Sequence, residues 1–310
     1  MLSSLSRSIY ARPRQLHLVY ARASSFPKPW PAARTLSSAA DAPREEECFT
    51  EHLTGDNAGI AVLSLNRPKA RNALSRALVD SFRAELQRLR YNTTDTRVVV
   101  LRSLVDNVFC AGADLKERAT MSPTEVTSFL YTLRQAYREL ETLPMPTIAA
   151  IDGAALGGGI EMALCCDFRT AGPKAKIGLP ETKLAIIPGG GGTQRLTRLV
   201  GVDKAKLLIY TARILDHVGA EKYGKSIGDG RAIQSESAFN GALALAREML
   251  PQGPIAMRMA KLAIDYGGPL DLDTGLAFEE RCYAQVIPTN DRLEGLRAFR
   301  EKRQPVYRGE

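Results

Sequence analysis

Apolar residues recur along this chain with two different periods, and segments of the two kinds alternate. Residues 60–68 (IAVLSLNRP) and 97–103 (RVVVLRS) are short runs rich in β-branched side chains, which is typical of buried strands. Residues 72–90 lie between them, and their apolar side chains recur at helical spacing: Leu74, Leu78, Phe82, Leu86 and Leu89. The pattern predicts strand, helix and strand in that order.

The alternation continues over the next hundred residues and then changes. The pattern predicts a loop leading into a helix at 109–118, an amphipathic helix at 123–142, a strand at 146–153, a buried helix at 157–167, and one or two short strands around a Gly-Pro turn at 168–179. From about residue 193 to 310 the patterns are mostly helical. Alternating strands and helices followed by helices predict an α/β core of about 200 residues, closed by C-terminal helices.

Composition adds little to this picture except at the N-terminus. The chain is 45% hydrophobic and 25% charged, and it has no apolar run near the roughly 18 residues that a membrane span needs. Its formal charge of +8 is concentrated in residues 1–40, which hold six Arg or Lys residues and no acid, so the rest of the chain carries only +2. An acid-free N-terminus rich in Arg, Ser and Ala predicts a mitochondrial transit peptide, and a basic tail is the alternative.

The usual nucleophiles and metal ligands are poorly placed for chemistry. The five cysteines match no zinc-site spacing, and Cys165 and Cys166 lie among Ala, Leu and Met, which predicts small core residues. His52 and His217, the two histidines beyond the N-terminal segment, lie near no motif. We therefore expect no metal site, and carboxylates are left to carry the chemistry.

Two glutamates stand beside glycine-rich stretches within residues 148–196. Glu161 follows LGGGI, and Glu181 precedes KLAIIPGGGG. A pair of carboxylates can act as general base and general acid on one small molecule, and a coupled pair favours one ionised and one protonated member. The spacing indicates a site that could add water across a polarised double bond.

Two glycine turns that open helices complete this site. In FCAGADLKER and ALGGGIEMAL, free N–H groups of a first helical turn can stabilise a developing negative charge. If the N–H groups of Ala113 and Gly158 converge on one carbonyl oxygen, they form an oxyanion hole. Each cluster taken alone is also compatible with a simple close contact between a helix and a strand.

These motifs together resemble those of the enoyl-CoA hydratase (crotonase) superfamily. The resemblance rests on FCAGADLKE, AAIDGAALGGGIEMALCCD, GLPETKLAIIPGGGGTQRL and IPTNDRLEGLRAFREKRQP, and it covers roughly residues 50–310. It implies a crotonase-like spiral core of repeated ββα units at 46–245 and a C-terminal helical trimerisation region at 246–310, after a transit peptide at 1–40. CAGADLKER, LPQGPIAMRMAKLAI and YAQVIPTNDRLEG are most similar to the branch that hydrates 3-methylglutaconyl-CoA in leucine catabolism.

The resemblance also assigns roles to residues. It implies that Glu161 and Glu181 are catalytic and that the Ala113 and Gly158 amides hold the thioester oxygen. It further implies contacts with the acyl chain or coenzyme A, although Lys302 is also compatible with a plain surface lysine: Ala111, Asp114, Leu115, Lys116, Gly189, Phe299 and Lys302. Coenzyme A is then part of the substrate, and no separate cofactor is expected.

The resemblance implies a mitochondrial matrix enzyme that forms a homotrimer or a hexamer. The presence of both glutamates favours hydration over isomerisation or thioester hydrolysis. The alternatives are a broader short-chain enoyl-CoA hydratase of fatty-acid oxidation, an RNA-binding protein with secondary hydratase activity, and an inactive scaffold. Residues 88–102 (RLRYNTTDTRVVVLR) hold no lysine, which weakens the expectation of RNA binding.

One segment departs from the family pattern. After Tyr223, the chain continues with GKSIGDGRAIQ in place of the short apolar Gly-Leu-Val segment of the family. Residues 224–238 contain few apolar side chains and three glycines, so they predict a loop that buries little surface.

Overall fold

The computed structural model describes residues 46–92, 95–223 and 237–310, all within one compact unit. The predicted transit peptide at 1–40 and most of the unusual segment, residues 224–236, lie outside the described residues.

Two sheets form the core. The larger sheet contains five strands in the order β1 (Cys48–His52), β2 (Ile60–Leu65), β3 (Val98–Ser103), β5 (Thr147–Ile151) and β7 (Phe168–Ala171). Only the β1–β2 pair in this sheet is antiparallel. The smaller sheet contains β4 (Val108–Cys110), β6 (Ala154–Leu156), β8 (Lys176–Gly178) and β9 (Ile214–Asp216), with β9 antiparallel to β8.

The chain passes between the two sheets as it advances. β3, β5 and β7 enter the larger sheet, and each is followed by a strand of the smaller sheet, namely β4, β6 or β8. Each pair then leads into helix: α2 (Leu115–Ala119) and α3 (Pro123–Glu141), α4 (Gly158–Ala163), or the 3₁₀ turn η3 (Glu181–Leu184). This repeated ββα spiral confirms the predicted fold class.

The larger sheet is buried on both faces, because alternate residues of a strand point to opposite sides. Ala61, Leu63 and Leu101 join the cluster that contains α1 (Arg76–Tyr91), α3 and α4. Ile60 and Val98 face the other way, toward α8 (Ala238–Met249). Burial on both sides explains why the strands read as continuous apolar runs in the sequence.

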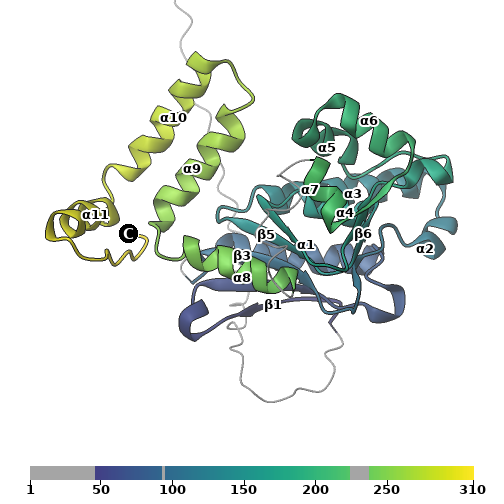
Figure 1. Ribbon diagram of the computed structural model, residues 1–310, viewed down its shortest axis with the longest axis horizontal. Coiled ribbons are helices and arrows are strands. Elements are labelled where there is room, and N and C mark those ends of the chain that lie inside the picture. The colour runs from purple at the N-terminus through teal and green to yellow at the C-terminus, as the bar shows by residue number, and fades with distance from the viewer. Residues whose placement is uncertain (1–45, 93–94, 224–236) are drawn as a thin grey trace, which may run out of the picture. The chain divides into compact units, whose positions relative to one another are not determined.

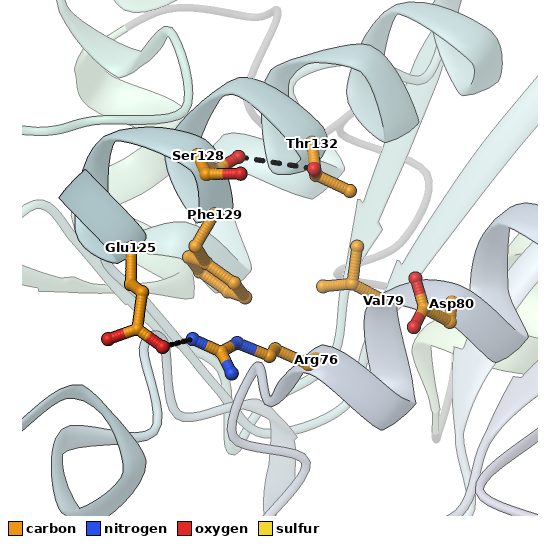
Figure 2. Close-up of a pocket in the computed structure, with 7 residues that line it drawn as sticks. All are labelled: Arg76, Val79, Asp80, Glu125, Ser128, Phe129 and Thr132. Carbon is orange, nitrogen blue, oxygen red and sulfur yellow. Dashed lines mark hydrogen bonds and ion pairs between the residues drawn. The ribbon is translucent and has the colours of Figure 1, made fainter. Parts of the chain in front are cut away.

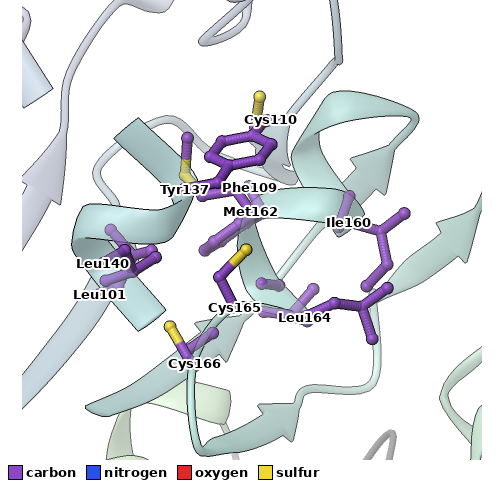
Figure 3. Close-up of a cluster of buried hydrophobic side chains, with 14 of the residues drawn as sticks. Leu101, Phe109, Cys110, Tyr137, Leu140, Ile160, Met162, Leu164, Cys165 and Cys166 are labelled. Atoms are coloured by element: carbon purple, nitrogen blue, oxygen red, sulfur yellow. The ribbon is translucent and has the colours of Figure 1, made fainter. Parts of the chain in front are cut away.

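The hydrophobic cluster that contains α1 and α3 packs around α4 (Figure 3). Phe109 and Tyr137 are fully buried there, and Met162 lies beside them. Cys165 and Cys166 are 3% and 4% exposed, which confirms the prediction that they are core residues. α4 is therefore fixed on several sides, and it can hold a functional side chain in one position.

The helix starts carry local capping signals. Ser75 accepts a hydrogen bond from the Leu78 amide at the start of α1. Ser122 and Glu125 form a reciprocal capping box at the start of α3, with Pro123 as its first residue. α1 thus begins at Arg76, four residues later than the predicted segment 72–90, because residues 72–75 form the loop that leads to the cap.

The second half of the chain is mostly helical, as the pattern predicts, apart from β9. Its helices are α5 (Gly192–Val200), α6 (Val202–Tyr210), α7 (His217–Tyr223), α8, α9 (Pro254–Gly267), α10 (Leu272–Val286) and α11 (Asn290–Glu301). α9 and α10 pack side by side (Figure 1). The expected boundary at residue 245 falls inside α8, which packs against the sheet. Among the described residues, no helix is long and apolar enough to cross a membrane.

Candidate active site

The glycine run before Glu161 forms a sharp turn from β6 into α4. Gly157 has φ 51° and ψ −122°, a conformation that side chains rarely allow, and its amide donates to the Gly178 carbonyl. Gly158 is the first residue of α4. Among the described residues, the Gly158 N–H has no hydrogen-bond acceptor, as expected for the first turn of a helix.

A second turn, at Gly112 and Ala113, lies against the first. A Cβ atom built on Gly112 would lie 2.8 Å from the Leu156 carbonyl oxygen and 3.5 Å from the Gly158 nitrogen. Leu74 bridges to Ala113, donating to the Gly112 carbonyl and accepting from the Asp114 amide. In the described part of the chain, the Ala113 N–H also lacks an acceptor. Two unpaired amides therefore lie on neighbouring turns, as an oxyanion hole requires.

Asp114 holds the second turn in place. Its carboxylate caps α2 by accepting from the Glu117 amide, and it forms an ion pair with Arg67 at 2.8 Å. The Arg67 bond and these amide contacts hold the pKa of Asp114 below its usual range. The structure thus gives this predicted substrate contact a positioning role beside Ala113.

Glu161 points from the first turn of α4 into a cradle of backbone amides. Its side chain accepts from the Gly190 amide at 2.9 and 3.0 Å and from the Gly192 amide at 2.6 Å. A Cβ atom on Gly190 would lie 2.8 Å from a Glu161 carboxylate oxygen, so the cradle depends on glycine there. Burial raises the pKa of Glu161, while the amides and the charge of Arg195 oppose this shift.

Glu181 has a different environment at the start of η3. Burial, reinforced by the charge of Glu161, raises the pKa of Glu181 to about 7. Its Oε2 atom is buried and has no hydrogen-bond partner among the described residues. The other oxygen lies 3.0 Å from where a Cβ atom on Gly157 would stand, so Glu181 reaches the turn that carries the Gly158 amide.

Two further side chains support the site and were missed in the sequence. The Tyr137 hydroxyl donates to the Gly158 carbonyl at 2.6 Å. Arg195 donates to the Gly190 carbonyl at 3.1 Å and forms an ion pair with Glu141. The only signals for them were the helical spacing of Tyr137 within 123–142 and the position of Arg195 just after the glycine run.

The other predicted contacts fall into two groups. Gly189 and Ala111 are next in sequence to residues of the site: Gly189 precedes Gly190, whose amide donates to Glu161, and Ala111 precedes the turn at Gly112 and Ala113. Leu115 and Lys116 are exposed on α2 just beyond Ala113.

Phe299 and Lys302 lie at the end of α11, and Phe299 is 86% exposed. No side-chain hydrogen bond or ion pair within the described ranges joins Phe299 or Lys302 to the glutamates. Their contact with coenzyme A stays a prediction.

The surface also contains a separate pocket between α1 and α3, with a volume of about 230 Å³ (Figure 2). The Arg76–Glu125 ion pair crosses its edge, and Phe129 and Val79 form its apolar wall. None of the predicted site residues lines it. No group of three or more His, Cys, Asp or Glu side chains in the described ranges could hold a metal ion.

The fold is a spiral of ββα units, and its site places two carboxylates beside two backbone amides that have no acceptor among the described residues. Comparison with known proteins gives the family. Residues 55–310 match the enoyl-CoA hydratase/isomerase family, to which the chain belongs. The human protein named methylglutaconyl-CoA hydratase, mitochondrial, is 53% identical over 271 residues, covering 86% of this chain and 78% of that protein.

Other relatives agree with this assignment. Mouse enoyl-CoA hydratase domain-containing protein 2, mitochondrial, is 48% identical over 296 residues, which cover 94% of this chain and 99% of that protein. The crystal structure of an enoyl-CoA hydratase from Bacillus anthracis has a TM-score of 0.78 and 44% identity, covering 85% of this chain and all of that one. The predicted family, fold and class of enzyme are therefore confirmed.

Proposed function

We propose that this protein hydrates the α,β double bond of an enoyl-CoA thioester through Glu161 and Glu181. The observation that carries the proposal is the pair of glutamates beside two neighbouring backbone amides that have no acceptor among the described residues. The amides of Ala113 and Gly158 bind the thioester oxygen and make the β-carbon electrophilic. Coenzyme A belongs to the substrate, and the reaction needs no further cofactor.

The two glutamates divide the proton transfers. Glu161 accepts hydrogen bonds from two amides, which favours its ionised form, so it takes a proton from water as the oxygen attacks the β-carbon. The electrons of the double bond move onto the thioester oxygen and form an enolate. Glu181, with a pKa of about 7, is protonated in a large fraction of molecules and delivers its proton to the α-carbon. Water has then been added as H and OH.

We propose 3-methylglutaconyl-CoA as the substrate. Human, mouse and rat relatives that are each 53% identical to this chain carry the name methylglutaconyl-CoA hydratase. A short-chain enoyl-CoA of fatty-acid oxidation is the alternative substrate.

Loss of the ultraviolet absorbance of the conjugated thioester would test this function directly. The full chain is mixed with 3-methylglutaconyl-CoA, crotonyl-CoA and a longer straight-chain enoyl-CoA. Hydration with the highest kcat/KM on the branched substrate supports the proposal. Hydration of none of the three would overturn the hydratase function, whereas a preference for a straight chain would overturn only the proposed substrate.

We propose that the protein works in the mitochondrial matrix. The acid-free, Arg-rich residues 1–40 and the word mitochondrial in the names of the human and mouse relatives support this location. N-terminal sequencing of protein purified from its host should find a chain that lacks about the first forty residues. An intact Met1 on protein inside the matrix would contradict cleavage.

We also propose a trimer or a hexamer built through the C-terminal helices. α9, α10 and α11 expose large apolar side chains, which favours a covered surface: Ile264, Leu272, Leu276, Tyr283, Leu293, Leu296 and Phe299. Light scattering of the active protein should give three or six times the subunit mass. A stable active monomer would contradict this.

A further inference from the structure

One face of α3 lines the glycine turn that cradles Glu161. Leu130, Arg134 and Tyr137 are spaced by four and three residues, so they share a side of the helix. A Cβ atom on Gly189 would lie 2.8 Å from Leu130, and one on Gly190 would lie 2.5 Å from the Tyr137 ring. Gly190 in turn donates to Glu161. This face therefore borders the catalytic carboxylate.

Arg134 brings a positive charge to this border. Its Nε atom donates to the Gly189 carbonyl at 2.7 Å, and its side chain is exposed. Among the described residues it has no carboxylate partner, whereas Arg138 and Arg195 both pair with Glu141. The two terminal nitrogens of Arg134 are thus available to an anion.

The chemistry of the proposed substrate places an anion at this point. The water that Glu161 activates must attack the β-carbon, so the β-carbon lies next to the Gly190 cradle. In 3-methylglutaconyl-CoA, a CH₂ group and a carboxylate extend beyond the β-carbon, and in crotonyl-CoA only a methyl group does. The part of the acyl group beyond the β-carbon therefore extends toward Gly189 and Arg134.

We propose that Arg134 selects acyl-CoA substrates that carry a second carboxylate, by binding this carboxylate through its terminal nitrogens. A guanidinium binds a carboxylate with two parallel hydrogen bonds, which gives direction as well as charge. Leu130, beside Gly189, supplies an apolar wall for the methyl branch. The inference rests on the proposed hydratase function and adds to it the residue that determines specificity.

A purely structural role for Arg134 makes a different prediction. If Arg134 only held the Gly189 carbonyl, its loss would disturb the glutamate cradle and slow all substrates equally. If it binds the second carboxylate, its loss slows acidic substrates and spares neutral ones. The ratio of two rates on one protein separates these possibilities, because a change in folding or active fraction cancels from the ratio.

The experiment compares Arg134→Gln and Arg134→Lys with the parent on 3-methylglutaconyl-CoA and crotonyl-CoA. Arg198→Gln is the matched control, since Arg198 is exposed on α5 and bonds only to Gln194 among the described residues. Arg134→Gln should lower kcat/KM on the acidic substrate about 10- to 100-fold, the worth of a charge-assisted pair, and change it less than about threefold on crotonyl-CoA. Arg134→Lys should retain part of the preference.

Binding of unreactive analogues gives a second measurement that is independent of turnover. Glutaryl-CoA should lose about 10-fold or more in affinity for Arg134→Gln by calorimetry, while butyryl-CoA binds as it does to the parent. An equal loss of both substrates, or an unchanged preference for the acidic substrate in Arg134→Gln, would overturn the role of Arg134. A parent that hydrates neither substrate would instead overturn the proposed function.

Discussion

Glu161 and Glu181 have identical side chains but lie in contrasting surroundings. Glu161 is 2% exposed, lies on a helix fixed in the core, and has its carboxylate held by the amides of Gly190 and Gly192. Glu181 stands on a single 3₁₀ turn and has one oxygen that is buried without a partner in the described part of the chain. One carboxylate is bonded by the protein, and the other is available to bond with something else.

This difference bears on the base and acid roles that we propose for the two glutamates. Burial raises the pKa of Glu161, and hydrogen bonds from the Gly190 and Gly192 amides, which favour an ionised carboxylate, oppose this shift. Glu181 has little to offset burial, and the charge of Glu161 adds to the effect. The pKa of both carboxyl groups is raised, but the amides and Arg195 oppose this shift at Glu161, so the ionised form is better supported there than at Glu181. The proposed hydration needs this asymmetry.

The largest effect should follow from removing either carboxylate. Glu161→Gln and Glu181→Gln should each lower kcat by about 10²- to 10⁴-fold, the usual worth of a group that transfers protons in the transition state. The dissociation constant of a saturated acyl-CoA should change little, because the Ala113 and Gly158 amides remain. Steady-state kinetics and calorimetry measure the two quantities.

The same variants should differ in stability. Glu161→Gln removes the charge that the two amides stabilise and places an NH₂ donor against the Gly190 amide, so its melting temperature should fall. Glu181→Gln breaks no bond of Oε2 among the described residues and should melt at or above the parent temperature. Turnover at the parent rate in either variant would show that the substituted glutamate is not part of the mechanism. Equal loss of melting temperature in the two variants would contradict the proposed difference between their surroundings.

Some features of the site could be predicted from the sequence, and others are visible only in the folded structure. The glycine motifs predicted the residues of both turns, because a helix that opens with glycine presents its free amides wherever it is placed. The cradle of Glu161 could not be predicted, since Gly190 and Gly192 lie about thirty residues away, at the turn into α5. Tyr137 and Arg195 were missed for the same reason.

The strands show the same limit. The five apolar residues of β2 and the valine run of β3 made these two strands predictable from composition. β4, β6, β8 and β9 have three residues each, too few to show a period of two. β8 falls within residues 168–179, where the pattern predicted one or two short strands, whereas β4, β6 and β9 were not predicted as strands. They pair because the spiral brings them to the smaller sheet, so their formation depends on tertiary contacts.

A rise in pH should remove the proton from Glu181, and with it the difference between the two glutamates, without any mutation. The pKa of Glu181 is raised to about 7 from its ordinary value of 4.5, so the group loses its proton as pH rises through 7. If it donates the proton to the α-carbon, kcat/KM for hydration should fall about tenfold per pH unit above this pKa, which is that of the free protein. A pH–rate profile measures this. A rate that is flat from pH 6 to 9 would contradict an acid role for Glu181.

The same shift affects stability in a defined direction. A carboxyl group with a raised pKa in the folded state stabilises the fold below its unfolded pKa, and this contribution is lost as pH rises through the folded pKa. The free energy of unfolding of the parent should therefore fall between pH 4.5 and about 7 relative to Glu181→Gln. Denaturant titrations of the two proteins across this window compare them directly.

The smallest expected effect concerns the link between the two regions. Tyr137 is fully buried, donates to the Gly158 carbonyl at 2.6 Å, and packs against Gly190. Its side chain therefore contacts both the turn that carries the Gly158 amide and the glycines that bind Glu161. Tyr137→Phe removes the hydroxyl and keeps the ring. It leaves the Gly158 carbonyl without this donor, which should cost about 1 kcal/mol. If that cost falls on the transition state, kcat should drop about fivefold with little change in KM, because Gly158 then aligns its amide less well with the enolate oxygen. The pH profile should keep its midpoint, since neither glutamate loses a bond. A fall in melting temperature with kcat unchanged would show that Tyr137 stabilises the core without positioning the oxyanion hole.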